Sequence, residues 1–280
     1  MTGFSDEEKL MLYGAYGGTP LYLQQINEKE SFEGNIKRTY LKVTSYLYEE
    51  ALLLLSQEVQ EPGVYSAIIE AIASGYTKAN EISTKIGEDS AKCLKYIKTL
   101  CELGILHKET PFGEKESSRK TIYGILDFMF RFWYRYVFAN RTLIETGAQQ
   151  AVWERRIKPD YYSYMGLVFE KVCMDYLNAK NAKGELPILY TSIGRWWGTN
   201  AATHGQEEID LIANDGKDYL FGECKWRNEK LDISVLKDLK AKADVFSMNR
   251  KNSYYVLFSK SGFTEVVLNE ARADDSILLV

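Results

Sequence analysis

Two β-rich runs in the last third of the chain constrain the fold more than any other feature. They cover residues 208–213 and 219–226, and the turn sequence Asn214-Asp215-Gly216 lies between them. Runs of this kind form β-strands, and a turn of this type between two of them predicts an antiparallel hairpin. Because strand side chains alternate between two faces, Glu223 and Lys225 are expected to share one face.

The charged side chains of this hairpin have the pattern of a metal-dependent hydrolytic site. Asp210 precedes Glu223 by thirteen residues and is expected to reach the same face. Phosphodiester hydrolysis needs a hard divalent cation, and Mg²⁺ (or Mn²⁺) prefers a few carboxylates plus water. Asp210 and Glu223 are therefore the candidate metal ligands. Lys225 would orient the attacking water, and Glu170 on a preceding helix would add a water-mediated ligand. The alternative is structural, because Glu-x-Lys on a strand also occurs as an exposed charge pair.

Size and composition indicate a globular chain of more than one domain. The chain has 280 residues, 45% of them hydrophobic and 26% charged. The longest clean apolar run, residues 51–55, is far shorter than the ~20 residues of a membrane span, and the acidic start differs from a signal peptide. We therefore expect a cytoplasmic protein without membrane contact. The scattered cysteines argue against structural zinc and against a disulfide scaffold.

The first half of the chain reads as helical. Residues 1–60 are expected to form helices, one of them running from about residue 34 to 59. Residues 61–125 show three short helical patterns, followed by two β-rich runs around a polar loop at residues 109–120. Three helices and a hairpin in this order predict a winged helix-turn-helix.

Basic side chains of this winged helix are candidates for contacts with DNA phosphates. They are Lys92, Lys95 and Lys98 on the third helix, and Arg119 and Lys120 in the wing. The net charge of −4 argues against a strongly basic nucleic-acid protein, so any DNA contact would have to be local. A solvated face or a protein-binding surface remains the alternative, because acidic residues are interspersed.

The rest of the sequence predicts a connecting segment and an α/β domain. Residues 126–160 are dense in aromatic residues, which indicates buried connecting helices rather than a base-stacking platform. Residues 161–280 predict an amphipathic helix, then strands and one further helix in the order α-β-β-β-α-β, which is typical of a mixed sheet with flanking helices. The strands are expected near residues 188–193, 208–213, 219–226 and 254–258, and the later helix near residues 233–246. The chain as a whole is predicted to be a multi-domain α+β protein.

Several of these residues carry a family resemblance. Glu170, Asp210 and Glu223-Cys224-Lys225 resemble the PD-(D/E)XK signature of restriction-endonuclease-like domains, although the usual proline of the first motif is absent. Nearly the whole chain resembles the C-terminal part of a prokaryotic ATPase family, in which a P-loop ATPase domain precedes a winged helix and a restriction-endonuclease-like domain. The segments that carry this second resemblance are Gly17-Gly18-Thr19-Pro20-Leu21-Tyr22-Leu23, Phe132-Trp133-Tyr134-Arg135-Tyr136, Arg195-Trp196-Trp197-Gly198, Phe221-Gly222-Glu223-Cys224-Lys225-Trp226 and Phe258-Ser259-Lys260-Ser261-Gly262-Phe263.

The resemblance implies a nuclease-like domain without ATP hydrolysis. It makes residues 1–60 the end of an ATPase domain and residues 161–280 the restriction-endonuclease-like domain. The sequence has no Gly-x-x-x-x-Gly-Lys-[Ser/Thr], so this chain is not expected to use ATP. This pattern fits three kinds of chain: a truncated product, an expressed fragment, and a family member that has lost its ATPase domain.

The expectation is a DNA-associated protein with a Mg²⁺- or Mn²⁺-dependent nuclease domain. Many endonuclease-like domains cut both strands as dimers, so the resemblance also implies a homo-oligomer. The alternative is a non-catalytic DNA- or protein-binding regulatory module that keeps the fold and the charge pattern without turnover.

Overall fold

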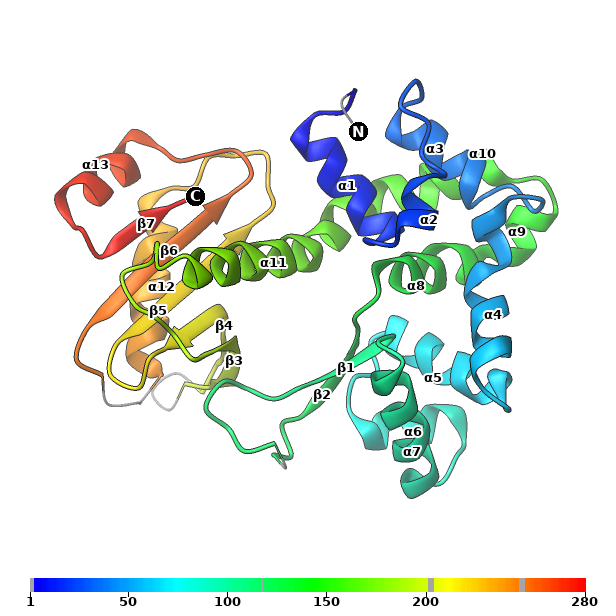
Figure 1. Cartoon of the computed structure of the whole chain (residues 1–280), viewed down its shortest axis with the longest axis horizontal. Helices are drawn as coiled ribbons and strands as arrows, with labels where there is room; N and C mark the ends of the chain where they lie inside the picture. The colour runs from blue at the N-terminus through cyan, green and yellow to red at the C-terminus, as the bar shows by residue number, and fades with distance from the viewer. Residues whose placement is uncertain (1–2, 117, 201–203, 247–249) are drawn as a thin grey trace. The chain divides into compact units, whose positions relative to one another are not determined.

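Two compact units divide the chain in a computed structural model that describes residues 3–116, 118–200, 204–246 and 250–280. The first unit contains Met1–Glu109 and Thr121–Tyr161, and the second contains Thr110–Lys120 and Tyr162–Val280. Both units combine helices with β-strands, so the chain is α+β as predicted (Figure 1). No helix among the described residues is long and apolar enough to cross a lipid bilayer.

Four helices open the first unit. They are α1 Asp6–Tyr16, α2 Pro20–Leu23, α3 Phe32–Thr39 and α4 Tyr46–Glu58. The single helix expected over residues 34–59 is wrong, because the chain turns between α3 and α4. Tyr40 and Leu41 are buried in this turn, and Ser45 Oγ donates a hydrogen bond to the Thr39 carbonyl at 2.7 Å. The side-chain bond and the two buried residues hold the turn in place of helical hydrogen bonds.

Three helices and a two-stranded antiparallel sheet follow, in the order predicted for a winged helix-turn-helix. They are α5 Pro62–Ala73, α6 Ala79–Ile86, α7 Ser90–Glu102, β1 Leu106–Glu109 and β2 Ile122–Ile125. Gly87 ends α6 with a φ of 73°, and Asp89 caps α7 by accepting two backbone N–H bonds. Ile68, Ile82 and Ile97 contribute one buried residue from each helix.

The aromatic segment contributes to the core of the first unit. It forms α8 Phe128–Phe132, the π-helix η1 Trp133–Val137, the 3₁₀-helix η2 Phe138–Asn140, α9 Arg141–Glu145, α10 Gln149–Val152 and a second π-helix, η3 Trp153–Ile157. Trp133 is fully buried, and its indole N–H donates to the Tyr48 carbonyl at 2.8 Å. Arg135 pairs with Asp160 at 2.7 Å. This burial confirms that the aromatic run is core.

A mixed five-stranded sheet organises the second unit. Its elements are α11 Lys158–Ala182, which begins in the first unit, β3 Ser192–Thr199, β4 Gln206–Asn214, β5 Tyr219–Lys225, α12 Ile233–Val245, β6 Ser253–Ser259, α13 Glu265–Ala273 and β7 Ile277–Leu279. The strand order is β3-β4-β5-β6-β7, with the β3–β4 and β4–β5 pairs antiparallel and the β5–β6 and β6–β7 pairs parallel. The hairpin expected from the two β-rich runs is confirmed as β4 and β5.

Two details of this unit differ from the sequence prediction. The strand expected at residues 188–193 begins only at Ser192, because the Tyr190 N–H donates to the side chain of Asn181 at 3.0 Å instead of joining a strand. The last helix and strand, α13 and β7, were not predicted.

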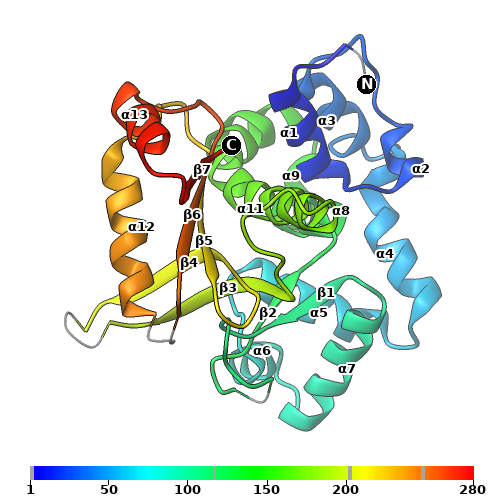
Figure 2. The same cartoon turned by 60° about the vertical axis from the view of Figure 1, so that its left-hand side comes forward.

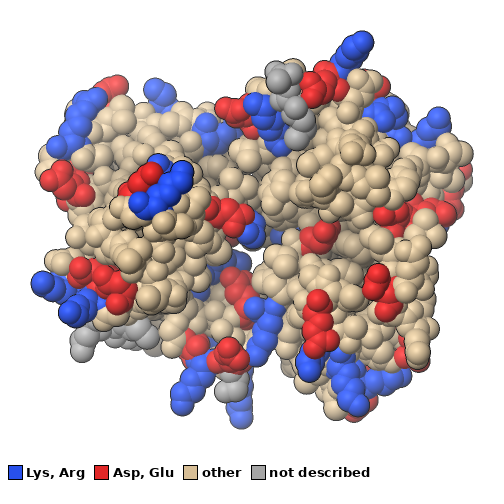
Figure 3. All heavy atoms as spheres, in the orientation of Figure 1, with Lys and Arg blue, Asp and Glu red and all other residues tan. Residues whose placement is uncertain are grey.

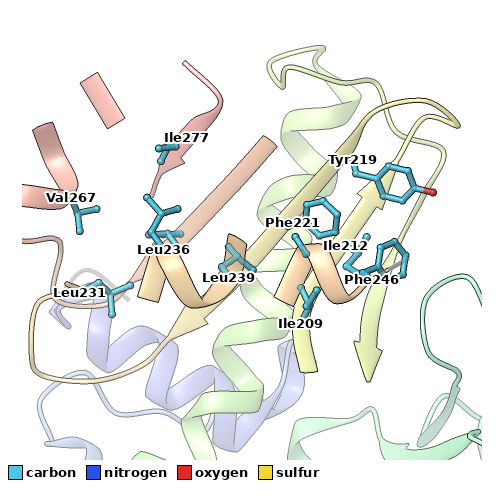
Figure 4. Close-up of a cluster of buried hydrophobic side chains, with 12 residues drawn as sticks. Ile209, Ile212, Tyr219, Phe221, Leu231, Leu236, Leu239, Phe246, Val267 and Ile277 are labelled. Atoms are coloured by element: carbon cyan, nitrogen blue, oxygen red, sulfur yellow. The ribbon is translucent and has the colours of Figure 1, made fainter. Parts of the chain in front are cut away.

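Helices cover both faces of the sheet, α11 on one side and α12 on the other (Figure 2). On the α12 side, Ile212 and Phe221 pack with Leu239 (Figure 4). On the α11 side, Leu220 packs with Leu177. β4 and β5 are therefore apolar on both faces along most of their length, and charged side chains enter near the carboxyl end of β5.

Gly222 lets the central strands approach closely. A Cβ at this position would lie 3.0 Å from Leu211 Cβ and 3.1 Å from Val256 Cγ1, on the strands to either side. We expect Gly222→Ala to lower the free energy of unfolding by about 1–3 kcal/mol, because the overlap cannot be relieved without moving a strand. Urea denaturation measures this change. Gly63→Ala is the control, since a Cβ there meets nothing within 4 Å. Equal midpoints for the two variants would contradict the expectation.

Candidate functional site

Three of the four residues predicted to carry chemistry, Asp210, Glu223 and Lys225, lie together at one end of the β4–β5 hairpin. Leu211 of β4 pairs with Gly222 of β5, so Asp210 and Glu223 are the next residues along the two strands. Lys225 Nζ donates a hydrogen bond to Glu223 Oε1 and lies 4.0 Å from Asp210 Oδ2. Two carboxylates and one ammonium group therefore share a small region of the second unit.

An irregularity in the β3–β4 ladder coincides with Asp210. Gly194 of β3 pairs with Ile212, whereas Trp196 pairs with Ile209, so the register shifts by one residue. Two residues of β4, of which Asp210 is one, consequently lie opposite a single residue of β3. Bulges of this kind re-aim side chains and are frequent beside active sites. No turn or periodicity signal in the sequence predicted this one.

The Asp210 carboxylate is buried, with 8% of the residue exposed. Its Oδ2 accepts a hydrogen bond from the backbone N–H of Cys224 at 2.8 Å. Burial, and next the negative charge of Glu223, raise the pKa of Asp210 to about 6, although the Cys224 N–H and Lys225 oppose the shift. The ionised form of Asp210 is therefore costly here, and a cation bound beside it would offset part of that cost.

Two lysines hold the Glu223 carboxylate. Besides Lys225, Lys242 of α12 donates to it, with Nζ 3.3 Å from Oε2 and 3.5 Å from Oε1. Burial lowers the pKa of Lys225, but the carboxylates of Glu223 and Asp210 outweigh burial and raise it. Lys242 was missed by the sequence reasoning. The only sequence signal for Lys242 is its position next to Ala243, at the edge of the row of buried residues on α12.

Glu170 lies on α11, as predicted, and is half-buried. Its described contact is with Arg195 of β3, whose Nε lies 3.7 Å from Glu170 Oε2. Arg195 also donates a hydrogen bond to Glu208. The role of Glu170 as a water-mediated ligand stays a prediction.

Cys224 and Trp226 point to the opposite face of β5, as the strand alternation predicted. Cys224 packs in the cluster on the α11 side with Cys173, and Trp226 packs against Phe169 of α11 with ring centroids 5.4 Å apart. Burial, and then Cys173, raise the pKa of the Cys224 thiol well above its ordinary value. Cys224 is therefore a packing residue and not an activated nucleophile.

The cations predicted to contact DNA are exposed, and several have carboxylate partners. Lys92 pairs with Glu88 at 3.3 Å, Lys98 with Glu102 at 3.6 Å and Lys120 with Glu114 at 2.7 Å. Lys95 and Arg119 are also exposed. On the face drawn in Figure 3, basic and acidic side chains are interspersed. DNA contact through these residues stays a prediction.

The loop between β1 and β2, Thr110–Lys120, belongs to the second unit. The Phe112 N–H donates to the Arg195 carbonyl on β3 at 2.7 Å, and its ring lies 6.2 Å from that of Phe246. Phe112 and Trp196 both pack against the buried cluster on the α12 side. The sequence predicted a polar loop here, and the structure adds that Phe112 packs this segment against the sheet.

Comparisons with known proteins match the part of the chain that contains the site to a family model without a known function. Residues 133–242 match the DUF234 family, described as archaeal and bacterial proteins of unknown function. Asp210, Glu223, Lys225 and Lys242 all lie within the matched segment. The uncharacterised protein MJECL04 of Methanocaldococcus jannaschii is 36% identical over 258 residues, which are 91% of this chain and 56% of that protein. The chain thus spans about half the length of this relative.

A comparison of structures adds no functional argument. The crystal structure of an O-methyltransferase, NcsB1, from neocarzinostatin biosynthesis overlaps 85% of this chain and 65% of that chain, at 13% identity. The TM-score is 0.19, which is too low to indicate a shared fold.

Proposed function

We propose that the second unit is a divalent-metal-dependent nuclease domain that hydrolyses phosphodiester bonds in DNA. One observation carries this proposal, namely the grouping of two buried carboxylates and an ammonium group where β4 and β5 pair. Lys225 Nζ is hydrogen-bonded to Glu223 and lies 4.0 Å from Asp210 Oδ2. Nucleases of this kind need carboxylates for the cation and a positive donor for the water or the phosphate.

Mg²⁺ or Mn²⁺ fits the oxygen donors of this site. Asp210 and Glu223 would hold the ion, and Mg²⁺ normally keeps several waters besides one or two carboxylates. Within the described ranges, no group of three or more His, Cys, Asp or Glu residues is arranged to hold a metal. When bound, the ion would acidify a water molecule and offset negative charge on the phosphate.

Lys225 is the residue proposed to act on the reacting atoms. Its raised pKa keeps it protonated at neutral pH, so it can donate to the attacking water or to a phosphate oxygen. Lys242 is proposed as a positioning residue. Because Lys242 also donates to Glu223, Lys225 can turn towards a substrate without leaving that carboxylate unpaired.

The wider proposal is an endonuclease-like relative of P-loop ATPases that binds DNA and has no ATPase activity of its own. The mixed sheet with helices on both faces supports an endonuclease-like fold for the second unit. The three helices and hairpin, with Lys95 exposed on α7, support a DNA-binding role for the first. Because the sequence lacks the phosphate-binding loop of P-loop enzymes, the proposal does not include ATP hydrolysis. The proposal also includes a dimer that cuts both DNA strands, and this part rests only on analogy with other endonuclease-like domains.

Metal removal is the first test of the nuclease proposal. The full chain is incubated with labelled DNA in Mg²⁺ or Mn²⁺, in EDTA, and in EDTA followed by excess metal. We expect cleavage with either cation, none in EDTA and recovery on adding metal back, since the proposed hydrolysis depends on the bound ion to acidify the water and to offset charge on the phosphate. Cleavage that persists in EDTA would contradict the proposal. So would metal-dependent cleavage that survives both Asp210→Ala and Lys225→Ala.

One observation favours a second candidate, a non-catalytic DNA- or protein-binding module. Lys225 and Lys242 together already balance the charges of Asp210 and Glu223, so the cluster is satisfied as a structural ion-pair network. This candidate predicts no cleavage with any divalent cation. It also predicts that metal titration produces no heat that depends on Asp210.

A further inference from the structure

A polar cavity of about 200 Å³ lies in the first unit, where the chain turns from α3 to α4. Two cations, Arg38 and Lys42, line it together with five neutral polar residues, among them Thr44 and Ser45. No carboxylate is among the described residues of this lining. Positive charge and hydroxyl groups around one hollow suit an anion rather than a cation or an apolar ligand.

The guanidinium of Arg38 is held in place and keeps two N–H groups for a ligand. Its Nε donates to Glu30 Oε2 at 2.9 Å, and its Nη2 donates to the Gln25 carbonyl and to Asn35 Oδ1, both at 2.8 Å. These bonds use three of the five N–H donors of an arginine. The two on Nη1 have no acceptor among the residues that the structure describes. A fixed guanidinium loses little freedom when it binds an oxyanion, so Arg38 is suited to this role.

Lys42 and Thr44 bring further donors from the turn itself. Both residues are exposed, and within the described ranges neither the Lys42 ammonium nor the Thr44 hydroxyl has a hydrogen-bond or ion-pair partner. The Ser45 hydroxyl donates to the carbonyls of Thr39 and Lys42, at 2.7 and 2.6 Å, and does not cap α4. The positive end of the α4 dipole, at Ser45 and Tyr46 in the lining, therefore adds to the charge of Lys42.

We propose that this cavity binds the terminal phosphate of a small phosphorylated molecule, a phosphomonoester. A phosphomonoester carries about −1.5 to −2 charges at neutral pH, which two lining cations match better than the single charge of a phosphodiester. Glu30 offsets part of the Arg38 charge, so Lys42 supplies most of the net charge. The size also indicates a small ligand, since sites for drug-sized molecules begin at about 300 Å³. The inference is independent of the nuclease proposal, because every lining residue belongs to the first unit.

Calorimetric titration of the full chain with phenyl phosphate, at about pH 8 where the phosphate is a dianion, tests the proposal. We expect saturable binding with a Kd of about 0.1–1 mM. Lys42→Gln should weaken it about tenfold to a hundredfold, because a charged donor is lost. Thr44→Val should weaken it about twofold to tenfold, the effect of a neutral donor, and Lys42→Arg should keep most of the affinity. Lys29→Gln is the matched control, since Lys29 is exposed in the same unit and does not line the cavity.

Inorganic phosphate and dimethyl phosphate, a singly charged diester, identify the source of the anion. The diester should bind at least about tenfold more weakly than phenyl phosphate. Equal binding of the diester would mean that the cavity takes a phosphate of a nucleic-acid strand, and the proposal would fail. Inorganic phosphate that binds far more tightly than phenyl phosphate would make this a free-phosphate site, which also overturns it. So would a Lys42→Gln variant that binds as the wild type does, or no saturation below about 10 mM. Thermal unfolding of each variant within a few degrees of wild type shows that the fold is kept.

Discussion

Asp210→Asn is expected to abolish metal-dependent cleavage and, at the same time, to make the metal-free protein more stable. The loss of activity should be about 10³-fold, because the amide removes a negative metal ligand that supports the transition state. The gain in stability follows from burial, since the Asp210 carboxylate is 8% exposed and lies near the charge of Glu223. An amide oxygen can still accept the hydrogen bond from the Cys224 N–H, so the local structure should be kept.

The stability effect should depend on pH in a direction opposite to that of most carboxylates. The pKa of Asp210 is raised from 3.8 to about 6 in the folded protein, so the folded state binds more protons than the unfolded state between these values. Its contribution to stability therefore falls as pH rises through this window. Above about pH 6 the full cost of the buried charge is present, and below about pH 4 it is absent. The advantage of Asp210→Asn should be about 1–3 kcal/mol at pH 8 and should vanish towards pH 4.

Denaturant unfolding of the metal-free proteins at several pH values measures this difference. Asp275→Asn is the control, because Asp275 is exposed in the same unit and should give no pH-dependent advantage. A variant that loses cleavage and also loses stability at pH 8 would contradict the expectation. That outcome would mean that ionised Asp210 is needed by the fold rather than tolerated for function.

Local signals in the sequence predicted much of the second unit. The two β-rich runs and their turn sequence predicted the β4–β5 hairpin, and strand alternation placed Glu223 and Lys225 on one face. These features depend on residues within a few positions of one another. The same holds for the helices and hairpin of residues 61–125, where glycine and the Asp89 cap mark the helix ends.

The features that the sequence did not predict depend on contacts between residues far apart in the chain. Lys242 reaches Glu223 from nineteen residues away, and nothing in the local pattern of α12 identifies that partner. The register shift beside Asp210 needs the pairing of β3 with β4, which periodicity alone does not specify. Phe112 lies in the segment predicted as a polar loop, yet it packs against Phe246, far along the chain. Sequence patterns predicted the elements and the candidate residues, whereas tertiary packing determined their neighbours.

Replacing the two lysines separately should distinguish a catalytic role from a positioning role. Lys225→Met is expected to slow cleavage by about 10²–10³-fold, the scale of removing a donor to the reacting atoms. Metal affinity should not fall and should rise up to about tenfold, because a competing positive charge beside Glu223 and Asp210 is gone. Glu223 keeps a hydrogen bond from Lys242 at 3.3 Å, so the variant should remain folded.

Lys242→Met is the matched comparison, since it removes the other donor to the same carboxylate. It should tighten metal binding by a similar factor but slow cleavage by no more than about tenfold, because Lys225 still contacts Glu223 and lies near Asp210. Calorimetric titration with Mn²⁺ gives the metal affinities, and single-turnover cleavage at saturating metal gives the rates. If both variants lose cleavage equally, Lys225 acts only through the position of Glu223, and the lysine that touches the reacting atoms has to be sought elsewhere in the second unit.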